Sequence, residues 1–256
     1  MVNFKMDIVS IRNDTAGCSD KIFLNSAGSS LPPRVVTQKM IEYLVQEEQV
    51  GGYETERLRS SEIDNFYVQV AAMLNCKTHN VAYAYSATDA YARALSAIPF
   101  RANDVILTTD DDYISNQIAL LSLQKRFHVK VVRTKNQPNG EIDLEFMEEQ
   151  IRLHHPVLIA VTHIPTNSGL VQQAEEVGGL CKKYDILYLL DACQSVGQMV
   201  VDVQKIGCDF LNATGRKFLR GPRSSGFLYV SDKVLSGDNE PLFLGCSTGY
   251  FRLLPQ

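Results

Sequence analysis

The chain carries the segment Asp191-Ala192-Cys193-Gln194-Ser195-Val196-Gly197 and, shortly after it, Ala213-Thr214-Gly215-Arg216-Lys217. Asp191 follows the apolar run 186–190, which has the length and composition of a buried strand. A carboxylate is therefore expected at the end of a strand. A second acid with apolar neighbours, Asp209, comes next, and Lys217 then stands between small residues and an arginine.

Outward from this segment, apolar runs alternate with amphipathic stretches, which is typical of helices covering a mostly parallel sheet. The sequence therefore predicts an α/β fold. The expected strands cover 105–107, 129–132, 157–161, 186–190 and 226–230, and the expected helices cover 35–48, 89–97, 115–127, 144–153 and 174–184. In open sheets of this kind ligands bind outside the carboxyl ends of the strands, where Asp191 and Asn167 fall.

These residue types suit one cofactor, pyridoxal 5′-phosphate. It needs an amine for a Schiff base, an acid that keeps its pyridine nitrogen protonated, and donors for its phosphate. A lysine in a loop, an aspartate at a strand end and the sequence Thr214-Gly215-Arg216 can supply all three.

Four further segments, in chain order, support this interpretation: 23–28 (Phe-Leu-Asn-Ser-Ala-Gly), 85–90 (Tyr-Ser-Ala-Thr-Asp-Ala), 112–116 (Asp-Tyr-Ile-Ser-Asn) and 162–169 (Thr-His-Ile-Pro-Thr-Asn-Ser-Gly). Together with 191–217 they resemble the class V aminotransferases, which include cysteine desulfurases and isopenicillin N epimerase-like enzymes. The resemblance implies the large domain of a fold type I enzyme over 22–244, an N-terminal extension over 1–21 and an atypical tail over 245–256. The family's small C-terminal domain is expected to be missing.

The resemblance also assigns roles to single residues. Lys217 would carry the cofactor, Asp191 would pair with the ring nitrogen, and Tyr113 would stack on the ring, so these three form the expected catalytic set. Ser86, Ala87 and Thr88 precede a predicted helix, whose N-terminus suits a phosphate. The remaining expected cofactor contacts are Thr214 and Arg216 at the phosphate and Gln194 and Asn167 at the phenolic oxygen.

Composition excludes several other classes of function. The 256 residues are 45% hydrophobic with a net charge of −4, and the charges of both signs are interspersed. We therefore expect a cytoplasmic protein with no nucleic-acid partner and no membrane segment. The six cysteines form no Cys-x-x-Cys pair and the histidines lack ligand spacing, so no metal site is expected.

The predicted function is a pyridoxal phosphate enzyme that acts on an amino acid through a carbanion at the alpha carbon. Transamination, epimerisation and carbon–sulfur cleavage all remain open. Cysteine desulfurases generally carry histidine where this chain has Tyr113 and Arg216, which favours the epimerase-like or other lyase branches.

The family resemblance also implies a homodimer. The alternative function is a truncated, non-catalytic homologue that binds the cofactor or a full-length partner. A nucleotide-binding domain is disfavoured because neither Gly-x-Gly-x-x-Gly nor a Walker motif occurs.

Overall fold

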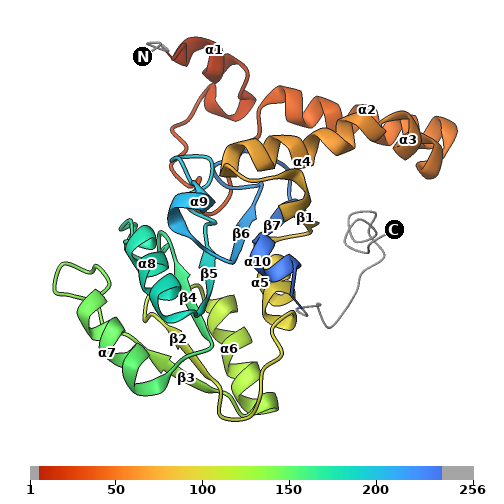
Figure 1. Cartoon of the computed structure of the whole chain (residues 1–256). Coiled ribbons are helices and arrows are strands. Elements are labelled where there is room, and N and C mark those ends of the chain that lie inside the picture. Colours follow the sequence, from red (N-terminus) through yellow and green to blue (C-terminus); the bar gives the residue numbers. More distant parts are fainter. Residues whose placement is uncertain (1–5, 238–256) are drawn as a thin grey trace.

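The computed structural model describes residues 6–237, so the expected tail over 245–256 and the expected domain end at 244 lie outside the described residues. The fold is α/β (Figure 1), and its single sheet has seven strands in the order β1-β7-β6-β5-β4-β2-β3. The strands are β1 (Val81–Ala84), β2 (Val105–Thr108), β3 (Lys130–Arg133), β4 (Leu158–Thr162), β5 (Leu187–Asp191), β6 (Phe210–Thr214) and β7 (Gly226–Val230). β7 runs antiparallel to both of its neighbours, and the other neighbouring pairs are parallel. The predicted mostly parallel sheet with helices is confirmed.

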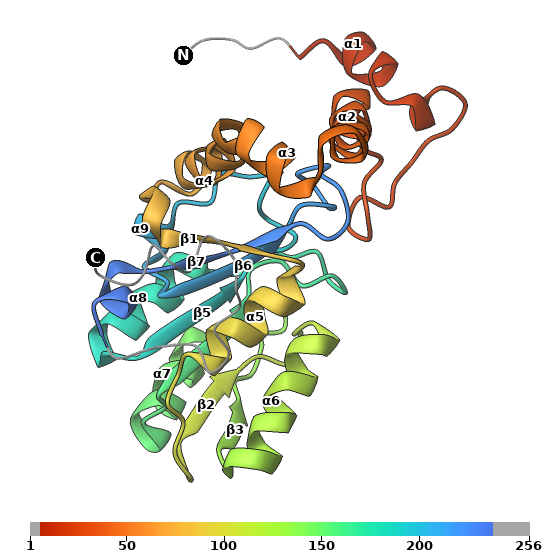
Figure 2. The ribbon, with the colours of Figure 1, turned by 90° about the vertical axis from the view of Figure 1, so that its right-hand side faces the viewer.

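Helices cover both faces of the sheet (Figure 2). One face packs on α5 (Ala87–Ser96) and α6 (Ile114–Phe127), and the other on α4 (Ser60–Leu74), α7 (Leu144–His154) and α8 (Ala174–Tyr184). The remaining helices are α1 (Ile8–Asn13), η1 (Ala16–Cys18), α2 (Arg34–Val50), α3 (Gly52–Leu58), η2 (Thr78–Asn80), α9 (Val203–Ile206) and α10 (Asp232–Leu235).

Because helices bury both faces of the sheet, its central strands appear in the sequence as continuous apolar runs. Along β4, Leu158 and Ala160 belong to the core beneath α5 and α6, whereas Ile159 and Val161 belong to the core beneath α7 and α8. Side chains of a strand alternate between the faces, so a central strand covered on both faces is apolar at every position.

Two strands and several helices were not predicted. β6 contains Asn212 among five buried positions, and β1 is a four-residue strand of small and aromatic side chains. Neither has the long aliphatic run that identified the other strands. No helix within residues 6–237 is both long and apolar enough to cross a bilayer.

The first prediction concerns the contact between α8 and α9. A Cβ added at Gly178 would collide with the carbonyl oxygen of Ile206, whereas a Cβ added at Gly179 meets nothing within 4 Å. We expect Gly178→Ala to lower the free energy of unfolding by about 1 to 3 kcal/mol because the backbone of α9 must move. Gly179→Ala, the matched control on the same helix, should raise it by about 0.5 to 1 kcal/mol, since alanine is the better helix former.

Urea denaturation of the two variants measures both values. Equal effects of the two substitutions would contradict the proposed close packing of α8 on α9.

Candidate active site

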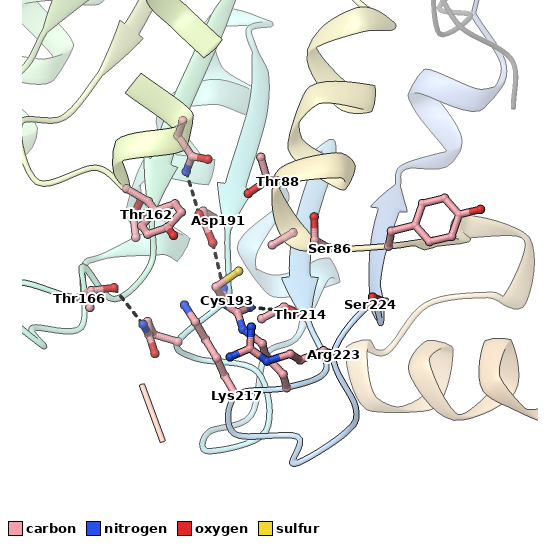
Figure 3. A pocket seen from close by; sticks show the side chains of 16 residues that line it. Ser86, Thr88, Thr162, Thr166, Asp191, Cys193, Thr214, Lys217, Arg223 and Ser224 are labelled. Atoms are coloured by element: carbon pink, nitrogen blue, oxygen red, sulfur yellow. Dashed lines mark hydrogen bonds between the residues drawn. The ribbon is translucent and has the colours of Figure 1, made fainter. Parts of the chain in front are cut away.

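A cavity of about 300 Å³ opens at the carboxyl ends of the central strands (Figure 3). Thr162 ends β4, Asp191 ends β5 and Thr214 ends β6, and all three line the cavity. Of the residues predicted for the site, those that line the cavity are Ser86, Ala87, Thr88, Tyr113, Asp191, Gln194, Thr214, Arg216 and Lys217. The structure thus brings together segments that lie far apart in the chain, and it leaves out Asn167.

Asp191 lies in the interior of the site and is only 3% exposed. Sheet register places it beside Thr162 on β4 and Asn212 on β6. Its Oδ1 accepts a hydrogen bond from the backbone N–H of Cys193 at 3.0 Å, and its Oδ2 accepts one from Asn116 Nδ2 at 2.7 Å. Both carboxylate oxygens are therefore partnered, as a buried carboxylate requires.

Lys217 lies in the loop after β6 and is 7% exposed. Its Nζ stands 5.7 Å from the ring centroid of Tyr113, the residue before the first turn of α6. The loop closes on itself, because Gly221 N donates to Gly215 O at 2.7 Å and Arg220 N donates to Lys217 O at 2.9 Å. These bonds constrain the loop that carries the amine, which faces the ring of Tyr113 at one side of the cavity.

Hydrogen-bond donors gather at two sides of the cavity, at the start of α5 and at the end of β6. Ser86 caps α5, its Oγ accepting from Asp89 N at 3.1 Å, so the first N–H groups of the helix face the cavity end of the sheet. On the other side Arg216 Nη1 donates to Thr214 Oγ1 at 3.3 Å. A helix N-terminus, a hydroxyl and a guanidinium are the donors that bind a phosphate group.

Gln194 and Asn167 were both expected at the cavity, and the structure places only Gln194 there. Gln194 Nε2 donates to Ala27 O at 3.1 Å and to Thr166 Oγ1 at 2.9 Å, and its Oε1 is buried without a partner among the described residues. Thr166 lines the cavity, whereas the neighbouring Asn167 is exposed and does not. The turn after β4 thus presents Thr166, not Asn167, to the site.

Sequence analysis missed a buried polar network behind Asp191, made by Asp112, Asn116 and Thr162. The Thr162 hydroxyl donates to Asp112 Oδ1, and Asn116 Nδ2 lies 3.3 Å from the same oxygen. Burial raises the pKa of Asp112, an effect that the Thr162 hydrogen bond opposes and the charge of Asp191 reinforces. The four-residue spacing of Asp112 and Asn116 at a helix start was the available signal, because it places both side chains on one face.

Four other lining residues were not predicted as site residues: Tyr85, Cys193, Arg223 and Ser224. Burial, followed by the charge of Asp191, raises the pKa of the Cys193 thiol well above its usual range. Ser224 has a φ of +59°, a left-handed conformation that costs a non-glycine residue energy. Its carbonyl oxygen accepts a hydrogen bond from the Tyr83 hydroxyl at 2.5 Å, which ties the rim of the cavity to β1.

The family model for aminotransferase class V matches residues 22–249. A probable cysteine desulfurase of Methanothermobacter thermautotrophicus is 31% identical over 242 residues, which are 93% of this chain and 60% of that protein. The apo structure of a cysteine desulfurase from Thermococcus onnurineus NA1 superposes with a TM-score of 0.85 at 24% identity, covering 93% of this chain and 60% of that one. A C-DES mutant with glycine covalently linked to its PLP cofactor has a TM-score of 0.84 at 20% identity, covering 91% of this chain and 62% of that one. This chain therefore spans about 60% of the length of the curated relative.

The second prediction concerns the rim of the cavity. Ser224→Gly should raise the free energy of unfolding by about 1 kcal/mol, because glycine adopts a positive φ without steric cost. Ser225→Gly is the matched control, since Ser225 Oγ donates to Pro222 O at 2.6 Å and the residue has no positive φ. Ser225→Gly should lower the free energy of unfolding by about 1 to 2 kcal/mol, because it removes this hydrogen bond and adds conformational entropy to the unfolded chain.

Thermal denaturation with calorimetry measures both changes. A Ser224→Gly protein that is less stable than the parent would show that the left-handed conformation is not strained.

Proposed function

The chain belongs to the class V aminotransferase family, and from this premise we propose that it is the cofactor-binding part of a pyridoxal phosphate enzyme acting on an amino acid. The observation that carries the proposal is the convergence of Lys217, Asp191 and a set of phosphate donors on one cavity. Asp191 ends β5, Lys217, Thr214 and Arg216 come from the end of β6 and the loop after it, and the remaining phosphate donors come from the start of α5, so the sheet is the frame that brings them together.

The cavity residues fit pyridoxal phosphate on chemical grounds. Lys217 offers a primary amine, and Asp191 offers a buried carboxylate to a protonated ring nitrogen. The N-terminus of α5 with Thr214 and Arg216 suits the phosphate, and Tyr113 offers an aromatic face. The chemistry matches the cofactor group by group.

When bound, pyridoxal phosphate supplies an electron sink for charge that develops at the substrate's alpha carbon. The protein's own part is positioning and proton transfer. Asp191 would hold the proton on the ring nitrogen, and Lys217 Nζ would release the cofactor to substrate and then move a proton at the alpha carbon. Arg216 and Thr214 would fix the phosphate, and Tyr113 would cover one face of the ring and limit access of water.

Within this class we favour cleavage of a carbon–sulfur bond. The support is the cysteine desulfurase name of the 31% identical relative. Tyr113 and Arg216 argue for a mechanism that differs from that of desulfurases with histidine at these positions, since imidazole is the side chain best suited to proton transfer near pH 7. Epimerisation and transamination would use the same residues.

The third prediction tests the proposed function directly. The purified chain mixed with pyridoxal phosphate should develop the visible absorbance of a lysine-bound cofactor. Borohydride reduction followed by peptide mapping should then place the label on Lys217, and Lys217→Ala should abolish it. The control is Lys205→Ala, because Lys205 lies away from this cavity and its loss should leave labelling unchanged. Label found mainly on another lysine would refute the site.

Product analysis separates the reaction types. Sulfide released from cysteine indicates carbon–sulfur cleavage, pyruvate from alanine indicates transamination, and D-alanine from L-alanine indicates epimerisation.

We also propose a homodimer in which α2 meets a second copy of the chain. The helix has 17 residues and buries none of them among the described residues. Large apolar side chains remain exposed along it, including Ile41 at 50% and Leu44 at 61%. Exposed apolar side chains gathered on one element are typical of a protein interface.

The fourth prediction follows from this surface. Leu44→Glu should shift the chain from dimer to monomer, because it places a charge in the buried centre of the proposed contact. Leu153→Glu on α7, at a leucine that is 68% exposed, should leave the assembly unchanged. Size-exclusion chromatography with light scattering measures the mass of each variant. A parent chain that is monomeric at micromolar concentration would contradict the proposed dimer.

A further inference from the structure

The amide of Asn116 lies between two carboxylates, that of the buried Asp191 and that of the half-buried Asp112. Asn116 is 2% exposed, and its Nδ2 donates to Asp191 Oδ2 at 2.7 Å and to Asp112 Oδ1 at 3.3 Å. Both neighbours are acceptors when ionised, so only the nitrogen side of the amide satisfies this position. The orientation of the Asn116 side chain is therefore determined by its surroundings.

Asp112 is in turn held from several directions. Its Oδ1 accepts from Tyr113 N at 3.0 Å and from the Thr162 hydroxyl, and its Oδ2 accepts from Thr108 Oγ1 at 3.2 Å. These partners come from β2, from β4 and from the residue before α6. Asp112 thus ties the start of α6, and Asn116 with it, to the carboxyl edge of the sheet.

The network determines the plane of the Asp191 carboxylate. Cys193 N holds Oδ1 and Asn116 Nδ2 holds Oδ2, so rotation about the bond to the carboxylate would break one of the two hydrogen bonds. With both oxygens held, the remaining lone pairs point in fixed directions. One donor alone would leave the carboxylate free to turn.

We propose that Asn116 and Asp112 are positioning residues, which hold the Asp191 carboxylate in the orientation that meets the ring nitrogen of the cofactor. This inference rests on the proposed function. It assigns to Asn116 a role exerted through Asp191, without contact to the reacting atoms. Outer residues that orient a binding side chain change affinity by about 10- to 100-fold at metal sites, and an effect at the lower end of that range is expected here.

The test compares the affinity of the protein for pyridoxal phosphate and for 1-deazapyridoxal phosphate, in which a C–H group replaces the ring nitrogen. The two probes share the aldehyde, the phenolic oxygen and the phosphate, so the ratio of their affinities isolates the contact between the ring nitrogen and Asp191. The parent chain should prefer pyridoxal phosphate, and Asn116→Ala should reduce that preference about tenfold. Equilibrium titration by absorbance and by calorimetry gives both constants.

The matched control is Gln117→Ala, one position further along α6. Gln117 is also a buried amide: its Oε1 accepts from Arg133 Nη2 at 2.6 Å and its Nε2 donates to Thr109 O at 3.4 Å, and within the described part of the chain it forms no hydrogen bond with Asp191. Its loss should lower stability while leaving the ratio of affinities unchanged. If Asn116 only stabilised the fold, Asn116→Ala would leave the ratio of affinities unchanged, as Gln117→Ala is expected to do.

Asn116→Ser is the second variant, in case the alanine protein does not fold. Its hydroxyl can satisfy a local partner but is too short to reach Asp191, so the preference should fall by a similar factor. Parent-like preference in a folded Asn116 variant would overturn the inference. A parent chain that binds neither probe would overturn the proposed function instead, and the two failures are therefore distinguishable.

Discussion

The close approach of two loops, the one after β5 and the one after β6, is the constraint on which the site depends. Gly197 has a φ of +93°, and a Cβ placed there would lie 2.7 Å from Leu219 N and from Phe218 C. Any side chain would therefore push the lysine loop away from the loop that begins at Asp191. Because Ala192 N also donates to Asn212 O at 3.0 Å, the two loops leave the sheet together and meet again at Gly197. The distance between the acid and the amine is determined by this packing.

The N-terminal segment also holds the loop after β6, which carries Lys217, through hydrogen bonds. Arg220, which has a φ of +59°, donates from Nε to Leu31 O at 3.2 Å and from Nη2 to the Thr15 hydroxyl. Ser30 N donates to Arg216 O at 2.9 Å. Thr15 lies within the stretch expected to be an extension, 1–21, yet it is 2% exposed and in contact with the loop. Part of that stretch therefore packs on the same loop that carries Lys217.

The prediction from sequence was most specific where one short segment contained the whole signal. Asp191 follows an apolar run and Lys217 stands in a distinctive motif, so both could be predicted, and the structure places both on one cavity. β6 was missed because Asn212, a buried polar residue, interrupts its apolar pattern. The choice between Thr166 and Asn167 depends on how the turn after β4 is directed, and neighbouring residues in a turn differ in exposure for reasons that composition does not encode.

The hydrogen-bond network of Asp112, Asn116 and Thr162 next to Asp191 could not be predicted from the sequence for a different reason. The network depends on the register of the strands in the sheet. Thr162 pairs with Asp191 across β4 and β5, and from there its hydroxyl reaches Asp112. A slip of one residue between these strands would turn every side chain of β4 to the other face, so Thr162 would point away from Asp112. The apolar alternation along β4 opposes such a slip, because Leu158 and Ala160 would exchange faces with Ile159 and Val161. The same packing that stabilises the core thus also aligns the polar side chains that hold the carboxylate of the site.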